Sequence, residues 1–387
     1  MRYERTKWHG RAAWTLANDV LQLTHLTGGG HIVDFRLLDD PAVSPLWVPS
    51  WKTQEPFHFK SNTDIRKFGQ PEIGKLLCGI AGHSLCLDLF GVPSPEEVRN
   101  GAALHGEAGV TKWQISGKKK ANEVSLTAKV RLPKAGLGFV RELRLRNGES
   151  VVYVREKVRN ESSRDQFFQW QQHVTLGPPF LTANDCAIDL PGARGRTFPD
   201  GYEGHEALAS GEDFDWPYAP KFDKGRVDLR RPLSLKRTGF VAGVQISQKY
   251  GHAFVCAVNT KLSLAIGYCF RRKDFPWVAL WEENRARKSS PWNGREQTRG
   301  LEFGASPLPM SRKENFALGN LFSTPTLAHV PAKGAVTASY VMFLSRVPKG
   351  AKVIEKISVG KDSLELKIPS RKIAHRVPAA VIRKYLG

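Results

Sequence analysis

Apolar and polar side chains alternate at every second position through much of this 387-residue chain. The clearest run is 124–132, where Val124, Leu126, Ala128 and Val130 are separated by serine, threonine and lysine. Successive side chains of a β-strand point to opposite faces, so this pattern predicts strands with one buried and one solvated face. Such half-buried strands pack as antiparallel sheets.

Runs of the same kind recur along the chain, and turn residues separate them. We expect further strands at 20–26, 31–37, 139–145, 151–158, 167–176, 240–247, 253–258, 262–270, 336–344 and 364–368. Helical patterns are confined to 95–99 and 378–385. Many short strands divided by turns are typical of a sandwich or barrel. We therefore predict an all-β fold, a large antiparallel β-sandwich with few short helices.

Two long stretches interrupt the strand pattern, at 47–82 and at 190–232. Long irregular connections in a compact domain are usually functional, so both are candidate binding loops. Residues 1–346 are expected to form the sandwich domain. Residues 347–387 are expected to form a basic C-terminal extension packed on it.

Basic residues outnumber acidic ones, 58 to 37, which gives a formal net charge of +21. A field of this sign attracts polyanions. However, many of the basic residues alternate with apolar ones, as on the wet face of a strand, and no nucleic-acid-binding motif accompanies them. The pattern favours a solvated basic surface over a nucleic-acid partner, with an acidic saccharide or sugar phosphate as the weaker alternative.

Targeting, redox and cofactor signals are few. No run of 18 apolar residues predicts a membrane span, and the first ten residues lack the apolar core of a secretory signal. Five cysteines without a C-x-x-C pair indicate reduced thiols, so we expect a cytoplasmic protein. The histidines lack metal-site spacing and the Gly28–Gly30 run lacks the rest of a phosphate loop, so we expect neither a metal nor a cofactor.

Five local motifs combine histidine, glutamate and tryptophan. They are His105-Gly106 followed by Trp113, the strand end 170–180, the run 277–285, the run 291–295 and the segment 299–307. The order of these motifs resembles that of the galactose mutarotase-like (aldose 1-epimerase) family. The resemblance extends from about residue 14 to residue 344, and it is to an uncharacterised, divergent branch of the family. The matching pieces are His105-Gly106, Gln172-His173 and Gly300-Leu301-Glu302 with Pro307.

The resemblance implies a β-supersandwich that interconverts the anomers of an aldose or sugar derivative in an open cleft. Opening the sugar ring requires a base at the C1 hydroxyl and an acid at the ring oxygen, and a glutamate and a histidine suit these roles. By resemblance, Glu302 is the base, His173 is the acid and His105 donates to the ring oxygen or a neighbouring hydroxyl. Each role has a competing interpretation. Glu302 could instead be a carboxylate paired with Arg299, and His173 could be a hydrogen-bonded histidine of the core.

The substrate-binding set departs from the family pattern. The family commonly has an arginine in a loop ahead of the H-G step, and the corresponding stretch here, 82–91, contains none. Either His83 or Asp88 takes its place, or the sugar contact differs; we select His83. Asp213 and Asp215 are both candidates for the family's sugar-binding aspartate, and we select Asp215. Trp281, Trp292 and Arg285 complete the predicted site. The tryptophans provide either a stacking platform for a sugar or part of the core.

A non-catalytic carbohydrate-binding sandwich is the alternative function. It would keep the tryptophans and have no use for the acid–base pair. In both cases the expected partner is a carbohydrate. Neither the sugar nor the oligomeric state follows from the sequence.

Overall fold

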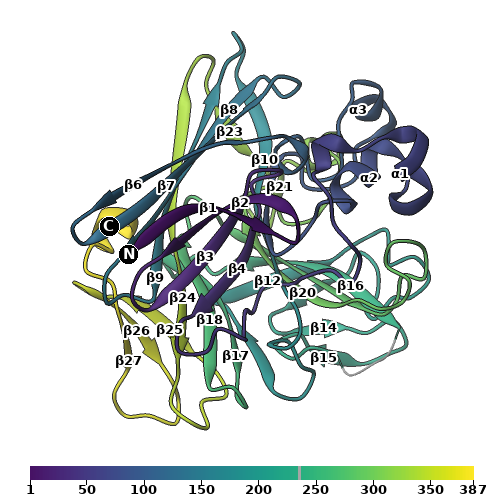
Figure 1. The fold of residues 1–387 in the computed structure, drawn as a ribbon. Coiled ribbons are helices and arrows are strands. Elements are labelled where there is room, and N and C mark those ends of the chain that lie inside the picture. Colours follow the sequence, from purple (N-terminus) through teal and green to yellow (C-terminus); the bar gives the residue numbers. More distant parts are fainter. Residues whose placement is uncertain (234–236) are drawn as a thin grey trace.

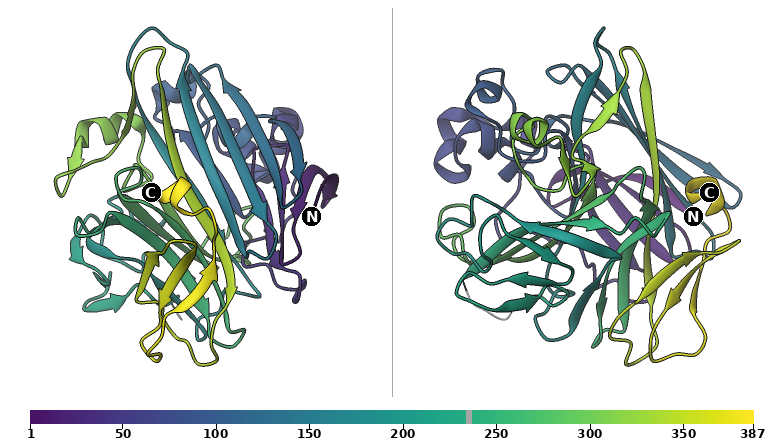
Figure 2. Two further views of the ribbon diagram at one scale, coloured as in Figure 1. Left: turned by 90° about the vertical axis from the view of Figure 1, so that its left-hand side faces the viewer. Right: turned by 180° about the vertical axis from the view of Figure 1, so that it is seen from behind.

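The structure, a computed structural model, describes residues 1–233 and 237–387. Two large antiparallel sheets face each other and enclose one main hydrophobic core (Figure 1; Figure 2). Helices α1 to α3 lie together at one end of the sandwich, whereas the C-terminal helix lies on the opposite side (Figure 1). The predicted all-β sandwich with few short helices is therefore confirmed.

The first sheet has twelve strands and carries the candidate site. Its order is β1 (Arg2–Trp8), β2 (Arg11–Ala17), β3 (Leu21–Leu26), β4 (Ile32–Leu37), β5 (His83–Asp88), β10 (Gln166–Leu176), β20 (Gln297–Gly304), β19 (Trp277–Asn284), β16 (Thr238–Ile246), β12 (Gly192–Thr197) and β13 (Asp213–Asp215), with β23 (Ala328–Val330) also paired to β10. Strand β10 lies between β5 and β20, and all its residues from Phe168 to Leu176 are buried, so both of its faces are covered there.

The second sheet has eight strands and lies against the first. Its order is β11 (Cys186–Asp189), β17 (His252–Asn259), β18 (Leu264–Arg271), β24 (Ala335–Arg346), β9 (Val151–Asn160), β8 (Leu137–Arg146), β7 (Glu123–Leu132) and β6 (Gln114–Lys120). Strands β7 and β8 alternate buried and more exposed residues as the sequence pattern predicts. At β7 and β8 one face of this sheet is therefore buried and the other solvated.

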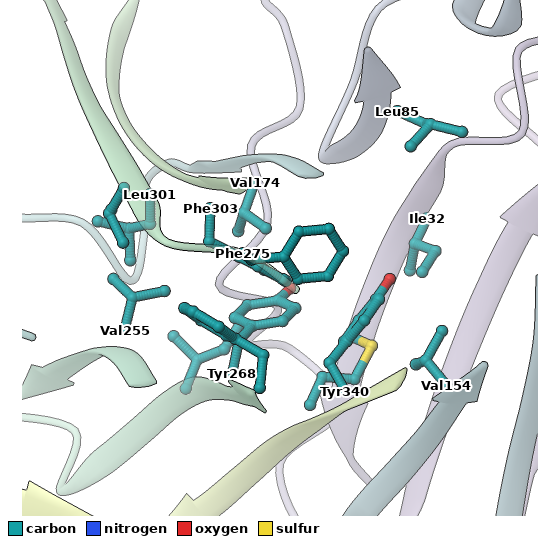
Figure 3. Packing of buried hydrophobic residues seen from close by; sticks show 14 of the residues in the cluster. Ile32, Leu85, Val154, Val174, Val255, Tyr268, Phe275, Leu301, Phe303 and Tyr340 are labelled. Atoms are coloured by element: carbon teal, nitrogen blue, oxygen red, sulfur yellow. The ribbon is translucent and has the colours of Figure 1, made fainter. Parts of the chain in front are cut away.

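Aromatic rings fill the centre of the core between the sheets. Figure 3 shows Phe275, Phe303 and Tyr340 packed together, with aliphatic side chains such as Val154 and Leu85 around them. The Phe303 and Tyr340 rings meet edge to face at 5.2 Å. Edge-to-face packing is favourable for aromatic pairs, and it joins the two sheets because Phe303 belongs to one and Tyr340 to the other.

A charged cluster lies inside this apolar core. Glu156 accepts hydrogen bonds from the Arg141 Nε at 2.7 Å, the Gln172 Nε2 at 2.7 Å, the Trp170 Nε1 at 3.1 Å and the Tyr340 hydroxyl at 3.1 Å. Arg141 and Glu156 are both completely buried. A buried carboxylate is tolerated when its charge is paired and its oxygens are hydrogen-bonded, as here.

The remaining elements are small. They are η1 (Pro56–His58), α1 (Ser61–Phe68), α2 (Pro71–Leu77), α3 (Pro95–Arg99), η2 (Ala108–Val110), β14 (Tyr218–Pro220), β15 (Arg226–Asp228), α4 (Arg312–Leu318), β21 (Asn320–Leu321), β22 (Thr324–Pro325), β25 (Lys356–Val359), β26 (Ser363–Lys367), β27 (His375–Pro378) and α5 (Arg383–Leu386). The expected helix at 95–99 is confirmed, whereas the one at 378–385 is wrong at its start, since Pro378 ends a strand.

The stretch 47–82, expected to be irregular, contains helices α1 and α2. Pro71 begins α2, where its missing N–H costs nothing, and Gly69 ends α1 at a φ of +89°.

Strands β25, β26 and β27 form a separate three-stranded sheet. It shares a hydrophobic cluster with the outer face of the eight-stranded sheet, in which Ile354 and Leu364 join Tyr153, Phe254 and Phe343. The C-terminal residues thus cover an apolar surface of β9, β17 and β24.

Candidate functional site

The two faces of β10 carry different chemistry. Gln172 and Val174 point into the sandwich, whereas His173 and Thr175 point to the opposite face, as the strand period requires. Gln172 pairs with Phe303 of β20 and Thr175 pairs with Gly300. This register sets His173 beside Glu302 on the neighbouring strand, so the two side chains meet although 129 residues separate them.

His173 and Glu302 form a close, buried pair. The His173 Nε2 lies 3.3 Å from the Glu302 Oε1. His173 is only 4% exposed and Glu302 only 2% exposed. The other ring nitrogen of His173, Nδ1, lies 3.1 Å from the Thr175 hydroxyl. Glu302 Oε1 is buried and has no hydrogen-bond partner in the described residues. A buried acceptor left in this state is costly, and such groups concentrate at functional sites.

The expected competing partner of Glu302 is engaged elsewhere. Arg299 donates to Glu282 at 2.5 Å and is completely buried against the Phe240 ring. Because Arg299 and Glu302 are three residues apart on one strand, they point to opposite faces. The interpretation of Glu302 as the ion-pair partner of Arg299 is therefore wrong.

Gly300 provides the space that the Glu302 carboxyl occupies. A β-carbon at Gly300 would lie 2.4 Å from Glu302 Oε1 and 3.1 Å from the Trp281 β-carbon. The carboxyl group thus lies over the glycine, two residues back on the same strand. Any side chain at this position would displace it from His173.

Burial sets the protonation of the pair. It raises the pKa of Glu302 well above its usual range. Burial also lowers the pKa of His173 well below its usual range, and the neighbouring His105 adds to this effect. Both shifts therefore favour the uncharged pair, a carboxylic acid beside a neutral imidazole.

His105 lies next to this pair. Its ring centre is 4.7 Å from that of His173, and its backbone has a φ of +61°, unusual for a residue with a side chain. The His105 Nδ1 contacts the Phe90 carbonyl at 2.5 Å, so Nδ1 must carry the proton and donate. Burial lowers the pKa of His105 to about 4. At neutral pH its Nε2 is therefore an acceptor, which does not fit the donor role expected from the sequence.

An aromatic cover closes the space over the pair. It consists of Trp47, Trp51, Tyr202, Trp281 and Trp292, with the Arg287 guanidinium lying over the Tyr202 ring at 4.6 Å and the Trp292 ring at 5.0 Å. The Trp281 ring is 5.8 Å from that of His173. Both residues of the pair are almost inaccessible beneath it. The predicted open cleft at the pair is therefore wrong for this conformation, while His105 stays partly exposed.

Two carboxylates fasten this cover. Glu283 accepts from the Ala286 and Arg287 amides at 2.5 and 3.1 Å and from the Tyr202 hydroxyl at 2.8 Å. Glu296 accepts from the Trp47 indole at 2.7 Å and the Ser50 amide at 3.0 Å. The turn after β19 and the stretch that begins at residue 47 are thereby tied to the sheet.

Three predicted site residues lie apart from the pair. His83 is completely buried between the sheets, where its Nε2 bonds Gln172 at 3.0 Å. Asp215 is exposed on β13 at the sheet edge, and four strands separate it from β10, roughly 24 Å at the usual strand spacing. Arg285 is exposed, and Arg287 contacts the tryptophans instead. The structure does bring Trp281 and His105 to His173, and Trp292 packs against Trp281.

Sequence reasoning missed Arg287, Tyr202, Trp47, Trp51 and Glu283. Tyr202 and the two tryptophans fall in the two irregular stretches singled out as candidate binding loops, which was the available signal. Nothing in the sequence shows that Arg287, and not Arg285, contacts the tryptophans. The turn after β19 decides which of the two side chains points toward them.

No group of three or more His, Cys, Asp or Glu side chains within residues 1–233 and 237–387 is arranged to hold a metal ion. In those same residues, no helix has the length and apolarity needed to cross a membrane. All five cysteines are buried and unpaired.

Comparison with known proteins identifies the fold. No protein-family model matches the chain, and no curated protein matches it. Among solved structures, a candidate aldose 1-epimerase from Klebsiella pneumoniae is similar with a TM-score of 0.63 and 15% identity, covering 87% of this chain and 79% of that one.

Two further structures agree. A galactose mutarotase-like protein from Clostridium acetobutylicum has a TM-score of 0.55 and 10% identity over 89% of this chain and 99% of that one. A galactose mutarotase related enzyme from Lactobacillus acidophilus has a TM-score of 0.52 and 11% identity, covering 87% and 99%. At these identities the likeness establishes the fold alone: the chain has the galactose mutarotase-like sandwich, far diverged in sequence.

Proposed function

We propose that this protein is an aldose 1-epimerase-like isomerase that interconverts sugar anomers by acid–base chemistry at His173 and Glu302. One observation carries the proposal: a buried carboxyl oxygen of Glu302 lies 3.3 Å from a histidine and has no hydrogen-bond partner in the described chain. A group that makes no structural hydrogen bond, in a site where burial shifts its pKa, is a candidate for catalysis.

The reaction needs one proton accepted and one proton donated. Glu302, as carboxylate, takes the proton from the C1 hydroxyl while His173, as imidazolium, gives its proton to the ring oxygen. The C1–O5 bond breaks with its electron pair going to O5, and C1 becomes an aldehyde carbon. After rotation about C1–C2, O5 attacks the other face of the carbonyl and both protons return.

The proton content of the pair fits this cycle. The reactive form, carboxylate beside imidazolium, contains the same single proton as a neutral carboxylic acid beside a neutral imidazole. Moving that proton across 3.3 Å converts one form into the other without exchange with solvent. Sugar hydroxyls that replace the missing hydrogen bonds of Glu302 would favour the charged form.

This scheme assigns His105 a binding role. Its Nε2 accepts a hydrogen bond from a sugar hydroxyl, because Nδ1 donates to the Phe90 carbonyl. The aromatic cover must move for a sugar to reach the pair, and its tryptophans then offer apolar faces to the sugar ring.

The second candidate is a carbohydrate-binding protein without turnover, and the aromatic cover is what favours it. It keeps the tryptophans and His105 but gives no reason for an unpartnered carboxyl group beneath them.

Exchange NMR on a panel of aldoses, uronic acids and hexose phosphates separates the two. We expect the wild type to accelerate anomer exchange of at least one sugar, and Glu302→Gln to reduce the rate by about 10²- to 10⁴-fold while saturation transfer from protein to sugar persists. Glu149→Gln, a matched change at a buried carboxyl beside the second sheet, is the control and should keep its rate. Saturation transfer without acceleration by the wild type would refute the enzyme in favour of the binding protein.

A further inference from the structure

A cavity of about 930 Å³ lies next to the His105-Gly106 step. It opens between η1, α3, α4 and the turn that joins β7 to β8, at the helical end of the sandwich seen in Figure 1. Small-molecule sites span about 300–1,000 Å³, so this cavity is at the large end of that range. A single hexose would leave most of it empty.

The charges of the cavity wall balance. Four acidic side chains (Asp88, Glu96, Glu97 and Glu107) face four basic ones (Lys75, Lys134, Arg312 and Lys313).

At least half of these charges already have partners: Arg312 contacts Asp88 at 2.5 Å and Glu97 at 3.5 Å, and the Lys134 ammonium donates to the Gly101 carbonyl at 2.6 Å. In a chain with a net charge of +21, a neutral, polar wall of this kind does not select a polyanion. It offers hydrogen bonds of both signs to an uncharged ligand rich in hydroxyl groups.

Exposed phenylalanine rings border the same cavity. Phe316 of α4 is 64% exposed and Phe57 of η1 is 37% exposed. The Phe316 ring is held edge to face against Phe167 at 6.0 Å, and the Phe167 ring in turn lies 4.8 Å from that of His329. Exposed apolar surface beside a polar cavity marks binding sites, and flat rings stack against the C–H faces of sugars.

The cavity adjoins the acid–base pair through two segments. Gly106 and Glu107 line it directly, and the ring of the preceding residue, His105, lies 4.7 Å from that of His173. Asp88 lines it too, and Ser84, on the same face of β5, pairs with His173 in the sheet register. Neither His173 nor Glu302 is among the residues that line the cavity, so a chain of sugars in it reaches the pair by extending one end past His105.

We infer that this cavity binds the second and following residues of a neutral oligosaccharide whose reducing-end sugar reaches His173 and Glu302. The orientation of the reducing end rests on the proposed function. Binding of the saccharide in the cavity rests on the cavity alone. It makes the substrate the end of a larger saccharide instead of a free monosaccharide.

Saturation-transfer NMR and titration test this with maltotriose, cellotriose and chitotriose, each beside its monosaccharide. We expect at least one trisaccharide to bind more tightly than its monosaccharide, and Phe316→Ala to weaken that binding about threefold to tenfold without changing the monosaccharide. Phe222→Ala is the matched control, because Phe222 is equally exposed, at 65%, and lies away from the cavity. Both rings are on the surface, so neither change should unfold the chain.

Equal affinity for trisaccharides and monosaccharides, or equal losses in Phe316→Ala and Phe222→Ala, would overturn the inference. If the trisaccharide preference and its loss in Phe316→Ala appear without faster anomer exchange, the cavity assignment stands and the proposed isomerase fails. If the wild type accelerates anomer exchange of monosaccharides but shows no preference for trisaccharides, the proposed isomerase stands and the cavity assignment fails.

Discussion

Two buried glutamates, one on each side of the same strand, have opposite surroundings. On the core side of β10, Glu156 accepts four hydrogen bonds and faces the Arg141 guanidinium. On the outer side, Glu302 has a histidine at 3.3 Å and an oxygen with no hydrogen bond in the described chain. Neighbouring residues of β10, Gln172 and His173, serve these two environments.

The contrast separates a structural carboxylate from a functional one. A fully satisfied buried charge specifies how the two sheets pack and leaves no capacity for a ligand. An unsatisfied carboxyl group destabilises the folded chain until something else provides its hydrogen bonds. The burial of the two groups is alike, so burial alone does not reveal which of them reacts.

Removing the charge of Glu156 should have the largest effect on stability. Glu156→Gln leaves the Arg141 guanidinium buried without a counter-charge, which costs about 3–5 kcal/mol of unfolding free energy. Urea titration followed by circular dichroism measures it. Glu142→Gln, on the solvated face of the same sheet, is the control and should change little. Equal stability of Glu156→Gln and wild type would contradict the structural role.

A methyl group at Gly300 should disturb the pair without removing it. Gly300→Ala places a β-carbon where the Glu302 carboxyl lies and pushes it from His173. A displacement of about 1 Å at a catalytic group costs on the order of 100-fold in rate, so we expect anomer exchange to slow 10- to 100-fold. Gly251→Ala, at an exposed position without a positive φ where a β-carbon meets nothing within 4 Å, serves for comparison of stability. An unchanged exchange rate would show that the carboxyl position does not matter.

The smallest expected effect is that Glu302→Gln is more stable than the wild type, by an amount that grows with pH. The folded state holds the Glu302 proton to higher pH than the unfolded chain, because burial raises this pKa. The wild type therefore loses stability relative to Glu302→Gln as pH rises from the unfolded pKa of about 4.3 to the raised folded pKa, by about 1.4 kcal/mol per pH unit.

Melting temperatures of the two proteins between pH 4 and pH 9 measure this difference. Glu156→Gln should show no such gain at any pH, since its partner charge stays buried. A difference between wild type and Glu302→Gln that shrinks as pH rises would refute the assignment of a raised pKa.

Local patterns predicted the strands because their period of two appears in the residues themselves. The run 124–132 became β7 with its buried positions as expected. Helices α1 and α4 were not predicted, because both are short and lie among loop residues, and their stability comes from packing and caps such as Ser311 with Glu314. Strand order could not be read either, since pairs such as β10 with β20 join distant residues.

The site residues were also predictable where local sequence patterns mark them and unpredictable where the sheet order or a turn positions them. His173 and Glu302 came from motifs, and the structure brings them together. His83 and Asp215 were selected by residue type alone, and their positions depend on strand direction and sheet order, which place one in the core and the other at an edge. Arg287 needed the geometry of a turn.

The position of β24 has a consequence for how the chain is made. This strand lies between β18 and β9 in the eight-stranded sheet, so β9, synthesised by residue 160, waits for residues 335–346 before it gains that neighbour. Until then the edge of β9 and the apolar faces on both sides of the sheet are open to other nascent chains. A chain stopped before β24 would therefore keep this edge open and be prone to aggregate.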